Sequence, residues 1–276
     1  MDPVPGAANA QAIERMYGPA ASDYEEIWAP LLRPYGLRLL DMLALASPTR
    51  VLDLGCGVGR LLPDIRERAP GALIVGTDRT EAMLRRTSPA FGRIVMDAVR
   101  PAFADAVFDA VVSSFVVFHL PDPRAALEAV RRSLRPGGRV AVSVWGPESS
   151  FPAEDAWTEE LDAVGVPQDP AAGGPRDGME LVNSSDKLRS ILQSAGFRNV
   201  TAETAEWTKP WELDAFVDWV TRLGPSRRRL EQLPADHRRA AIARARTRVA
   251  SLPKEDLVDH DTVVLASGEA PAAPPA

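Results

Sequence analysis

The sequence predicts an α/β protein whose mostly parallel sheet is doubly wound, with helices on both faces. From residue 50 onward, short apolar runs alternate with stretches of helical periodicity, as expected for strands joined by crossover helices. The first run leads into three glycines on alternate positions, Gly55, Gly57 and Gly59. Such a strand-to-helix turn lets the backbone approach a ligand closely, so a binding site is predicted there.

Helical sequence precedes the first strand. Residues 22–28 begin with Ser22 and carry Glu25 three positions later, the capping-box pattern of a helix start. Residues 31–45 place apolar side chains at the helical period. We therefore expect an N-terminal helical segment over residues 1–46.

The elements of the sheet region follow in order. The helix 123–134 is the best delimited, because Asp122 can cap it, Pro123 suits its first turn and Gly137 follows its end. The predicted strands are 50–54, 73–78, 93–97, 108–115, 139–145, 199–206 and 262–266. The predicted helices after the first strand are 60–69, 80–86, 123–134, 153–164, 183–196, 211–223 and 234–252.

The pattern changes after the fifth strand, which predicts insertions into the sheet domain. Pro and Gly are scattered through 147–178, and 211–259 is largely helical. The tail 268–276 is rich in Pro and Ala and is expected to be disordered. The predicted domain core combines 47–146, 179–210 and 260–267, with 147–178 as an insertion and 211–259 as a helical cap.

Composition excludes some classes of function. The chain has 276 residues and a formal net charge of −6, which disfavours general binding to nucleic acids or anionic membranes. No apolar run approaches the length of a bilayer span, and the N-terminus lacks a secretory signal pattern. The single cysteine, Cys56, predicts a cytoplasmic location because it cannot form an internal disulfide. No cluster has metal-ligand spacing, so no metal is expected.

The stretch 222–248 is dense in arginine. It could form a face for RNA or for an anionic substrate. It could equally be the solvated side of helices whose apolar stripe includes Ile242 and Val249. Aromatic residues that would stack on bases are not interleaved with these arginines, which favours the solvated face.

Two predicted strands end in a carboxylate, Asp53 and Asp78. Asp78 lies at about the spacing from the first glycine at which a nucleotide-binding sheet places an acid on ribose hydroxyls. A dinucleotide fingerprint would have glycine at position 60, where Arg60 stands, and Asp53 would repel a pyrophosphate. A nicotinamide-dependent dehydrogenase is therefore disfavoured, and Asp53 indicates a ligand with a positive group near the turn.

With these residues the chain resembles the class I S-adenosylmethionine-dependent methyltransferases. It is most similar to their small-molecule, ubiquinone/menaquinone-type branch, also called methyltransferase type 11. The resemblance implies a seven-stranded Rossmann-like methyltransferase fold with a helical insertion before the last strand. It also implies S-adenosylmethionine as cofactor and S-adenosylhomocysteine as product. The matching segments are the glycine turn 53–59, the acid at 78, and the stretches 96–98, 108–115 and 134–140.

The resemblance also implies cofactor-binding residues. Asp53 would contact the ammonium group, Asp78 the ribose hydroxyls and Asp97 the adenine amino group. Alternatives remain open: Asp78 and Asp97 could cap helices, Met83 could be a core residue, and a serine could satisfy its own backbone. The full set is Tyr24, Asp53, Gly55, Gly57, Gly59, Asp78, Arg79, Met83, Asp97, Ala98, Ser113 and Ser114.

His119 and Tyr17 are the candidate catalytic residues. His119 lies just beyond the fourth predicted strand, where a neutral imidazole could take a proton from a hydroxyl or an acidic carbon. It could instead be a hydrogen-bonded histidine near the mouth of the site. Tyr17 and Tyr24 could close over the cofactor as part of a lid, or simply pack the N-terminal helices on the core.

These observations predict methyl transfer to a small, partly apolar acceptor, with oxygen favoured as the methylated atom and carbon next. Secondary or quinone-type metabolism would supply such an acceptor. The alternatives are an RNA or protein methyltransferase, and a cofactor-binding domain that catalyses another reaction. The expected partner is the small-molecule acceptor, with nucleic acid disfavoured, no membrane span, and a monomer or homodimer as the oligomeric state.

Overall fold

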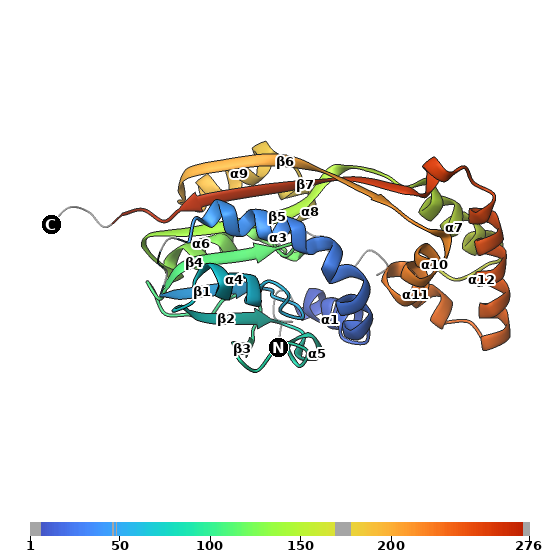
Figure 1. Cartoon of the computed structure of the whole chain (residues 1–276), viewed down its shortest axis with the longest axis horizontal. Coiled ribbons are helices and arrows are strands. Elements are labelled where there is room, and N and C mark those ends of the chain that lie inside the picture. Colours follow the sequence, from blue (N-terminus) through green and yellow to red (C-terminus); the bar gives the residue numbers. More distant parts are fainter. Residues whose placement is uncertain (1–6, 46, 48, 169–177, 273–276) are drawn as a thin grey trace. The chain divides into compact units, whose positions relative to one another are not determined.

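A computed structural model of the chain describes residues 7–45, 47, 49–168 and 178–272. Within these residues, seven strands form one sheet in the order β3-β2-β1-β4-β5-β7-β6 (Figure 1). All four pairings among the first five strands are parallel, which confirms the predicted α/β fold class. The strands are β1 (Arg50–Leu54), β2 (Leu73–Asp78), β3 (Gly92–Val95), β4 (Phe108–Ser114), β5 (Leu134–Ser150), β6 (Arg198–Pro210) and β7 (Val258–Glu269).

The last two strands run in opposite directions to each other. Asn199 donates a side-chain hydrogen bond to Glu269, and the Thr201 and Ser267 hydroxyl oxygens lie 2.9 Å apart. Residue numbers therefore rise along β6 as they fall along β7, so this pair is antiparallel. The sheet is mostly parallel, as the sequence predicted.

Helices flank the strands in the order expected from the helical periodicity. In α6 the predicted cap is present, because Asp122 Oδ1 accepts a hydrogen bond of 2.9 Å from the backbone N–H of Ala125. The helix over Gly224–Glu231 was not predicted. The helices are α1 (Ala7–Tyr17), α2 (Ala21–Asp23), α3 (Ala29–Leu43), α4 (Leu62–Arg68), α5 (Glu81–Leu84), α6 (Pro123–Ser133), α7 (Pro152–Ala163), α8 (Met179–Val182), α9 (Ser185–Ser194), α10 (Leu213–Arg222), α11 (Gly224–Glu231) and α12 (Ala235–Ala250), with η1 (Tyr24–Trp28), η2 (Val117–His119) and η3 (Lys254–Leu257) as short π- or 3-10-helical segments.

The capping box predicted at Ser22 is absent. Helix α2 is preceded by Ala20, which has no side-chain cap, and η1 continues it as a π-helix. The Glu25 carboxylate is used elsewhere, in ion pairs with Arg60 and Arg86. Tertiary contacts therefore override the local capping pattern.

The tail predicted to be disordered is partly ordered. Strand β7 includes Gly268 and Glu269, and Ala270 is buried. Backbone hydrogen bonds run from the Gly137 N–H to the Ala270 carbonyl and from the Ala270 N–H to the Gly138 carbonyl. This pairing with the start of β5 satisfies backbone groups that would be exposed to solvent if the tail were disordered, as its composition predicted. The rest of the predicted tail, 273–276, lies outside the described residues.

The described part of the chain divides into two compact units. The first comprises the described residues of 1–146, 175–205 and 263–276, and contains the parallel part of the sheet. The second comprises those of 147–174 and 206–262. The chain passes between the units within β5, β6 and β7.

The second unit has an aromatic core of its own. The Trp157 and Phe216 side chains are fully buried, with ring centroids 5.9 Å apart, and Trp211 stacks on Trp219. The buried Arg229 donates a hydrogen bond of 2.9 Å to the Val166 carbonyl. These contacts let the unit bury apolar surface apart from the sheet.

The arginine-dense stretch 222–248 is extensively ion-paired within the second unit. Each such pair offsets a positive charge with a nearby carboxylate, which supports the solvated face rather than a nucleic-acid surface. Several of these carboxylates lie three or four positions from their arginine on the same helix. The pairs are Arg222–Asp218, Arg227–Glu231, Arg229–Asp162, Arg239–Asp236, Arg244–Glu160 and Arg246–Asp214.

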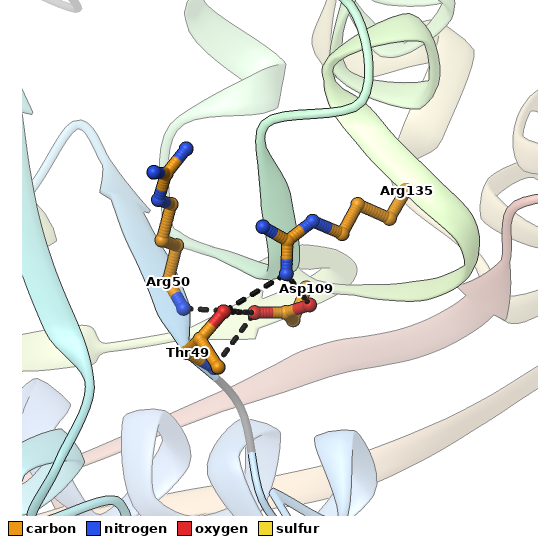
Figure 2. A network of polar contacts seen from close by, with 4 residues as sticks. All are labelled: Thr49, Arg50, Asp109 and Arg135. Atoms are coloured by element: carbon orange, nitrogen blue, oxygen red, sulfur yellow. Dashed lines mark hydrogen bonds and ion pairs between the residues drawn. The ribbon is translucent and has the colours of Figure 1, made fainter.

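A carboxylate fastens the amino ends of β1 and β4. Asp109 Oδ2 accepts hydrogen bonds from the Thr49 N–H at 2.7 Å, the Thr49 hydroxyl at 2.8 Å and the Arg50 N–H at 2.8 Å (Figure 2). Arg135 donates to Asp109 Oδ1 at 2.7 Å. Burial alone would raise the pKa of Asp109, but these hydrogen bonds lower it below its ordinary value of 3.8.

Asp109→Asn is expected to destabilise the protein by about 1–3 kcal/mol at neutral pH, because hydrogen bonds to a charged acceptor are lost. The pKa of Asp109 is lower in the folded chain than its ordinary value. Its contribution is therefore complete above about pH 4 and is lost as the pH falls through the folded pKa. Urea unfolding of wild type and variant should show a difference that shrinks in acid. The exposed Asp105→Asn serves as the matched control, and an equal effect there would contradict the role of Asp109.

Candidate active site

The predicted site residues gather at the carboxyl ends of the parallel strands, the edge opposite the Asp109 network. The glycine turn follows β1, Asp78 ends β2 and Ser114 ends β4. An open cavity lies there. It is lined by Ile13, Tyr17, Tyr24, Gly55, Gly57, Asp78, Arg79, Met83, Met96, Asp97, Ala98, Ser114, Phe115, Val116, His119 and Leu120.

Of the three glycines in the turn, Gly57 is the one at which an added Cβ would meet open space. All three have positive φ. A Cβ on Gly55 would lie 2.3 Å from Val116, and one on Gly59 would lie 2.7 Å from Thr87, so these two glycines are required by internal packing. A Cβ on Gly57 would meet only the edge of a tyrosine ring, at 3.7 Å. The space above Gly57 is therefore available to a ligand.

Asp78 joins the turn to the second strand. Its Oδ2 accepts a hydrogen bond of 2.9 Å from the Gly57 N–H, and its Oδ1 accepts one of 2.8 Å from the Thr80 N–H. Burial raises the pKa of Asp78, and these hydrogen bonds from Thr80 and Gly57 offset part of that rise. Each carboxylate oxygen has a second lone pair, so the side chain can still accept from a ligand hydroxyl in the cavity.

Arg79 and Asp97 form an ion pair at the cavity wall. Arg79 Nη1 lies 2.6 Å from Asp97 Oδ2, and Asp97 Oδ1 accepts a hydrogen bond from the Val99 N–H at 2.9 Å. The pair holds the segment after β3 against the end of β2. Beside it, Met83, Met96 and Ala98 add apolar surface of the kind that a flat heterocycle can pack on.

Asp53 faces a second, adjoining cavity. It is almost fully buried and lines this cavity together with Arg33, Cys56 and Arg60. Burial and then the nearby Asp78 raise the pKa of Asp53 to about 7. Such a carboxyl is poorly stabilised as an anion, and a cationic group of a ligand would stabilise its charged form. Tyr24, Gly55, Gly57 and Ser114 line both cavities.

Asp53 makes the stability of the ligand-free protein pH-dependent. Its pKa is about 7 in the folded chain, above the ordinary value of 3.8, so the folded state keeps a proton that the unfolded chain loses first. We expect its contribution to the free energy of unfolding to decline as the pH rises from about 4 to about 7, by up to ~4 kcal/mol. Asp53→Asn should abolish this decline in urea unfolding at about pH 5 and pH 8. Identical pH dependence in wild type and variant would contradict the assignment.

The two candidate catalytic residues lie within hydrogen-bond distance of each other. Tyr17 Oη, at the end of α1, lies 3.2 Å from His119 Nε2 on η2. Their rings meet edge to face with centroids 5.9 Å apart, and Tyr17 meets Tyr24 in the same manner at 5.7 Å. His119 is buried, 6% exposed, and both residues line the first cavity.

Two predicted cofactor residues do not line either cavity. Ser113 is buried and its hydroxyl donates to the Leu54 carbonyl at 3.0 Å, so it links β4 to β1. Gly59 packs against Thr87. The side chain at 113 points to the neighbouring strand, whereas Ser114 points the other way, as alternation along a strand requires.

Several residues that line the cavities are not in the set predicted from the sequence. Met96 lies within a matching segment, and Phe115 and Val116 follow the fourth strand at the binding edge, so their positions carried a usable signal. Ile13 and Leu120 carried none, because an apolar residue of a helix or turn is more often a core residue. Phe115 has a positive φ of 57°, an uncommon conformation for this residue type.

Comparison with known proteins identifies the family. Residues 52–142 match the family described as a methyltransferase domain. Nocamycin O-methyltransferase from Saccharothrix syringae is 31% identical over 245 residues, which cover 81% of this chain and 85% of that protein. Demethylmenaquinone methyltransferase from Thermus thermophilus is 39% identical over 117 residues, covering 40% of this chain and 53% of that protein.

Among solved structures, phosphoethanolamine N-methyltransferase 2 from Haemonchus contortus, bound to phosphomonomethylethanolamine and S-adenosylhomocysteine, has a similar fold. Its TM-score is 0.58 at 16% identity, over 96% of this chain and 60% of the longer one. Fold, site and relatives together define a methyltransferase of the class I type. The chain belongs to the S-adenosylmethionine-dependent methyltransferases that act on small molecules, and S-adenosylmethionine is its cofactor.

The residues present fit this cofactor. The open space above Gly57 suits a ligand that lies against the backbone, and Asp78 has acceptor capacity left for ribose hydroxyls. An ammonium group of the cofactor would stabilise the charged form of Asp53, and Met83 with Ala98 would offer an apolar surface to the adenine ring. Among the described residues, no helix is long and apolar enough to cross a membrane, and no cluster of acidic, histidine and cysteine side chains could hold a metal ion.

Proposed function

We propose that this enzyme methylates a hydroxyl group of a small, partly apolar acceptor, with an acidic carbon as the second candidate for the methylated atom. The observation that carries the proposal is the Tyr17–His119 contact in the first cavity. Next to it the cavity is lined by Phe115, Val116 and Leu120, none of which is charged. An apolar body with one reactive hydroxyl matches this lining.

For this reaction the protein must mainly align the methyl donor with the acceptor and remove a proton from the acceptor. When bound, S-adenosylmethionine supplies an electrophilic methyl group on a positively charged sulfur. In the neutral tautomer whose Nε2–H donates to Tyr17 Oη, His119 would accept the hydroxyl proton of the acceptor at Nδ1, which makes the oxygen nucleophilic. Tyr17 orients the imidazole through the contact at Nε2. Alignment of the two reactants can lower the barrier by several kcal/mol.

The N-terminal segment 1–46 serves in this proposal as a lid that excludes water. Tyr24 lies beside the open face of Gly57, and Tyr17 reaches His119 from the same segment. Ala21, Ala29, Val58 and Met83 form a small buried cluster against which both tyrosines pack.

Relatives support the choice of oxygen over carbon. Nocamycin O-methyltransferase covers most of the chain, whereas the match to demethylmenaquinone methyltransferase covers 40% of it. The acceptor is therefore sought first in secondary metabolism and second among quinone-type compounds. The ion-paired arginines of 222–248 offer little support for an RNA acceptor.

A panel of acceptors tests the proposal. The purified enzyme is incubated with S-adenosylmethionine and with matched compounds that share an apolar body but carry a phenol, an enol, a carboxylate or an amine, and with RNA and a protein extract. Mass spectrometry detects the gain of one methyl group. We expect methylation of the phenol or enol, dependent on His119. Methylation of the carboxylate alone, or of RNA or protein alone, would contradict the proposal.

A further inference from the structure

We propose that Glu25 is a positioning residue for cofactor binding, because its ion pairs hold the segment that carries Tyr24 against the glycine turn. The inference rests on the proposed lid role of the N-terminal segment. It adds a specific electrostatic contact as the means by which the lid is held. The sequence predicted a capping role for Glu25, but in the structure its carboxylate forms ion pairs instead.

The Glu25 carboxylate lies between two arginines from different parts of the cofactor site. Its Oε2 pairs with Arg86 Nε, just after α5, and its Oε1 lies 3.7 Å from Arg60 Nη2, just after the glycine turn. The same Arg60 nitrogen donates to the Glu25 backbone carbonyl at 3.4 Å. One residue of the N-terminal segment is thus tied to the end of the glycine turn and to the segment after α5, whose Thr87 hydroxyl donates to the Gly57 carbonyl at 3.5 Å.

The segment held in this way has an uncommon conformation. Tyr24–Trp28 form a π-helix, in which the Ala29 N–H bonds to the Tyr24 carbonyl. Such single π turns are rare inside α-helices and often mark functional sites. The turn places Tyr24, directly before Glu25, where it lines both cavities beside Gly57. Contacts with the core are therefore needed to stabilise this conformation over a regular helix.

The partial exposure of the three side chains limits the expected change in cofactor affinity. Side-chain exposure is 24% for Glu25, 49% for Arg60 and 39% for Arg86. Ion pairs of this exposure contribute little each and are screened by salt. We therefore expect a change in cofactor affinity of a few fold that diminishes with ionic strength. An effect through apolar packing would not diminish in this way.

The test measures binding of S-adenosylhomocysteine by calorimetry at ~50 mM and ~500 mM salt, where the screening length falls from about 14 Å to about 4 Å. Glu25→Gln keeps the shape and removes the charge. Its Kd at low salt should be about three- to tenfold above that of wild type. At high salt the two Kd values should agree within about twofold. The melting temperature without ligand should be nearly unchanged.

Exchanging the charges of Glu25 and Arg86 tests whether their ion pair is responsible for the affinity. Arg86 lines neither cavity, so Glu25→Arg combined with Arg86→Glu should regain part of the affinity that Glu25→Arg alone loses. Glu128→Gln, which removes the similarly exposed Arg124–Glu128 pair of α6, is the matched control and should bind as wild type. Hydrogen exchange at residues 24–29 should be faster in Glu25→Gln than in this control.

Three results would overturn the proposal: a wild-type Kd for Glu25→Gln at low salt, an equal difference at both salt concentrations, or no recovery in the exchanged pair. Should Glu25→Gln not fold, Arg86→Gln removes the same pair from the other side and is judged by the same criteria. Because the measurement uses the product and no acceptor, its failure is distinct from failure of the proposed hydroxyl methylation.

Discussion

Gly57→Val is expected to abolish binding of S-adenosylmethionine while leaving the chain folded. The added methyl groups would project into the space where the cofactor is proposed to lie, since nothing but a tyrosine ring edge stands within 4 Å of the new Cβ. We expect the Kd to rise at least ~100-fold. The variant also places a side chain at a φ of 54°, which costs about 1–2 kcal/mol of stability. Calorimetric titration and thermal melting measure the two effects separately.

The chain offers a matched control for the strain. Gly137 has a φ of 77°, and a Cβ there would meet nothing within 4 Å. Gly137→Val should therefore lose a similar amount of stability and keep its affinity for the cofactor. Wild-type affinity in both variants would show that the cofactor does not occupy the space above Gly57. Equal loss of affinity would show that strain, not occupancy, is responsible.

His119→Ala is expected to lower kcat by about 10²–10⁴-fold on a hydroxyl acceptor, the range of a lost general base. Binding of S-adenosylhomocysteine should change little, because the predicted contacts to the cofactor come from other residues. The measurement is single-turnover methyl transfer with an acceptor from the panel, alongside calorimetry. An unchanged rate would remove His119 from the mechanism, and a large loss of cofactor affinity would reassign it to binding.

Tyr17→Phe separates orientation from proton transfer. It keeps the ring that packs against Tyr24 and removes the hydroxyl that reaches His119 Nε2. We expect a fall in kcat of about tenfold, well below that of His119→Ala, with cofactor affinity retained. A loss as large as that of the histidine variant would instead indicate that the tyrosine hydroxyl itself handles the proton.

Much of the fold could be predicted because it depends on local patterns. The limits of β1 and β2 agree with the prediction, since each is a buried parallel strand and therefore a continuous apolar run. Helix α6 is bounded by a cap and by glycines, signals that act within a few residues. The glycine turn placed the site at the carboxyl edge for the same reason.

Features that depend on distant residues could not be predicted. The π-helix at Tyr24–Trp28 is tied to Arg86, which lies 61 positions beyond Glu25. The ordering of Ala270 depends on backbone groups at Gly137 and Gly138. Whether Ser113 or Ser114 faces the ligand depends on strand register, and a shift of one residue reverses the answer. Such contacts join residues far apart in the chain, so local sequence patterns do not predict them.

The Asp109 network bears on how such an enzyme could change its acceptor. It fastens the strand beginnings with Thr49, Arg50 and Arg135, far along each strand from the loop that carries Phe115 and His119. The anchoring contacts and the proposed site of acceptor recognition therefore lie at opposite edges of one sheet. Substitutions among the loop residues can alter which compounds are accepted without loosening the scaffold, so directed evolution of new acceptor preferences would best randomise that loop and keep the anchoring margin intact.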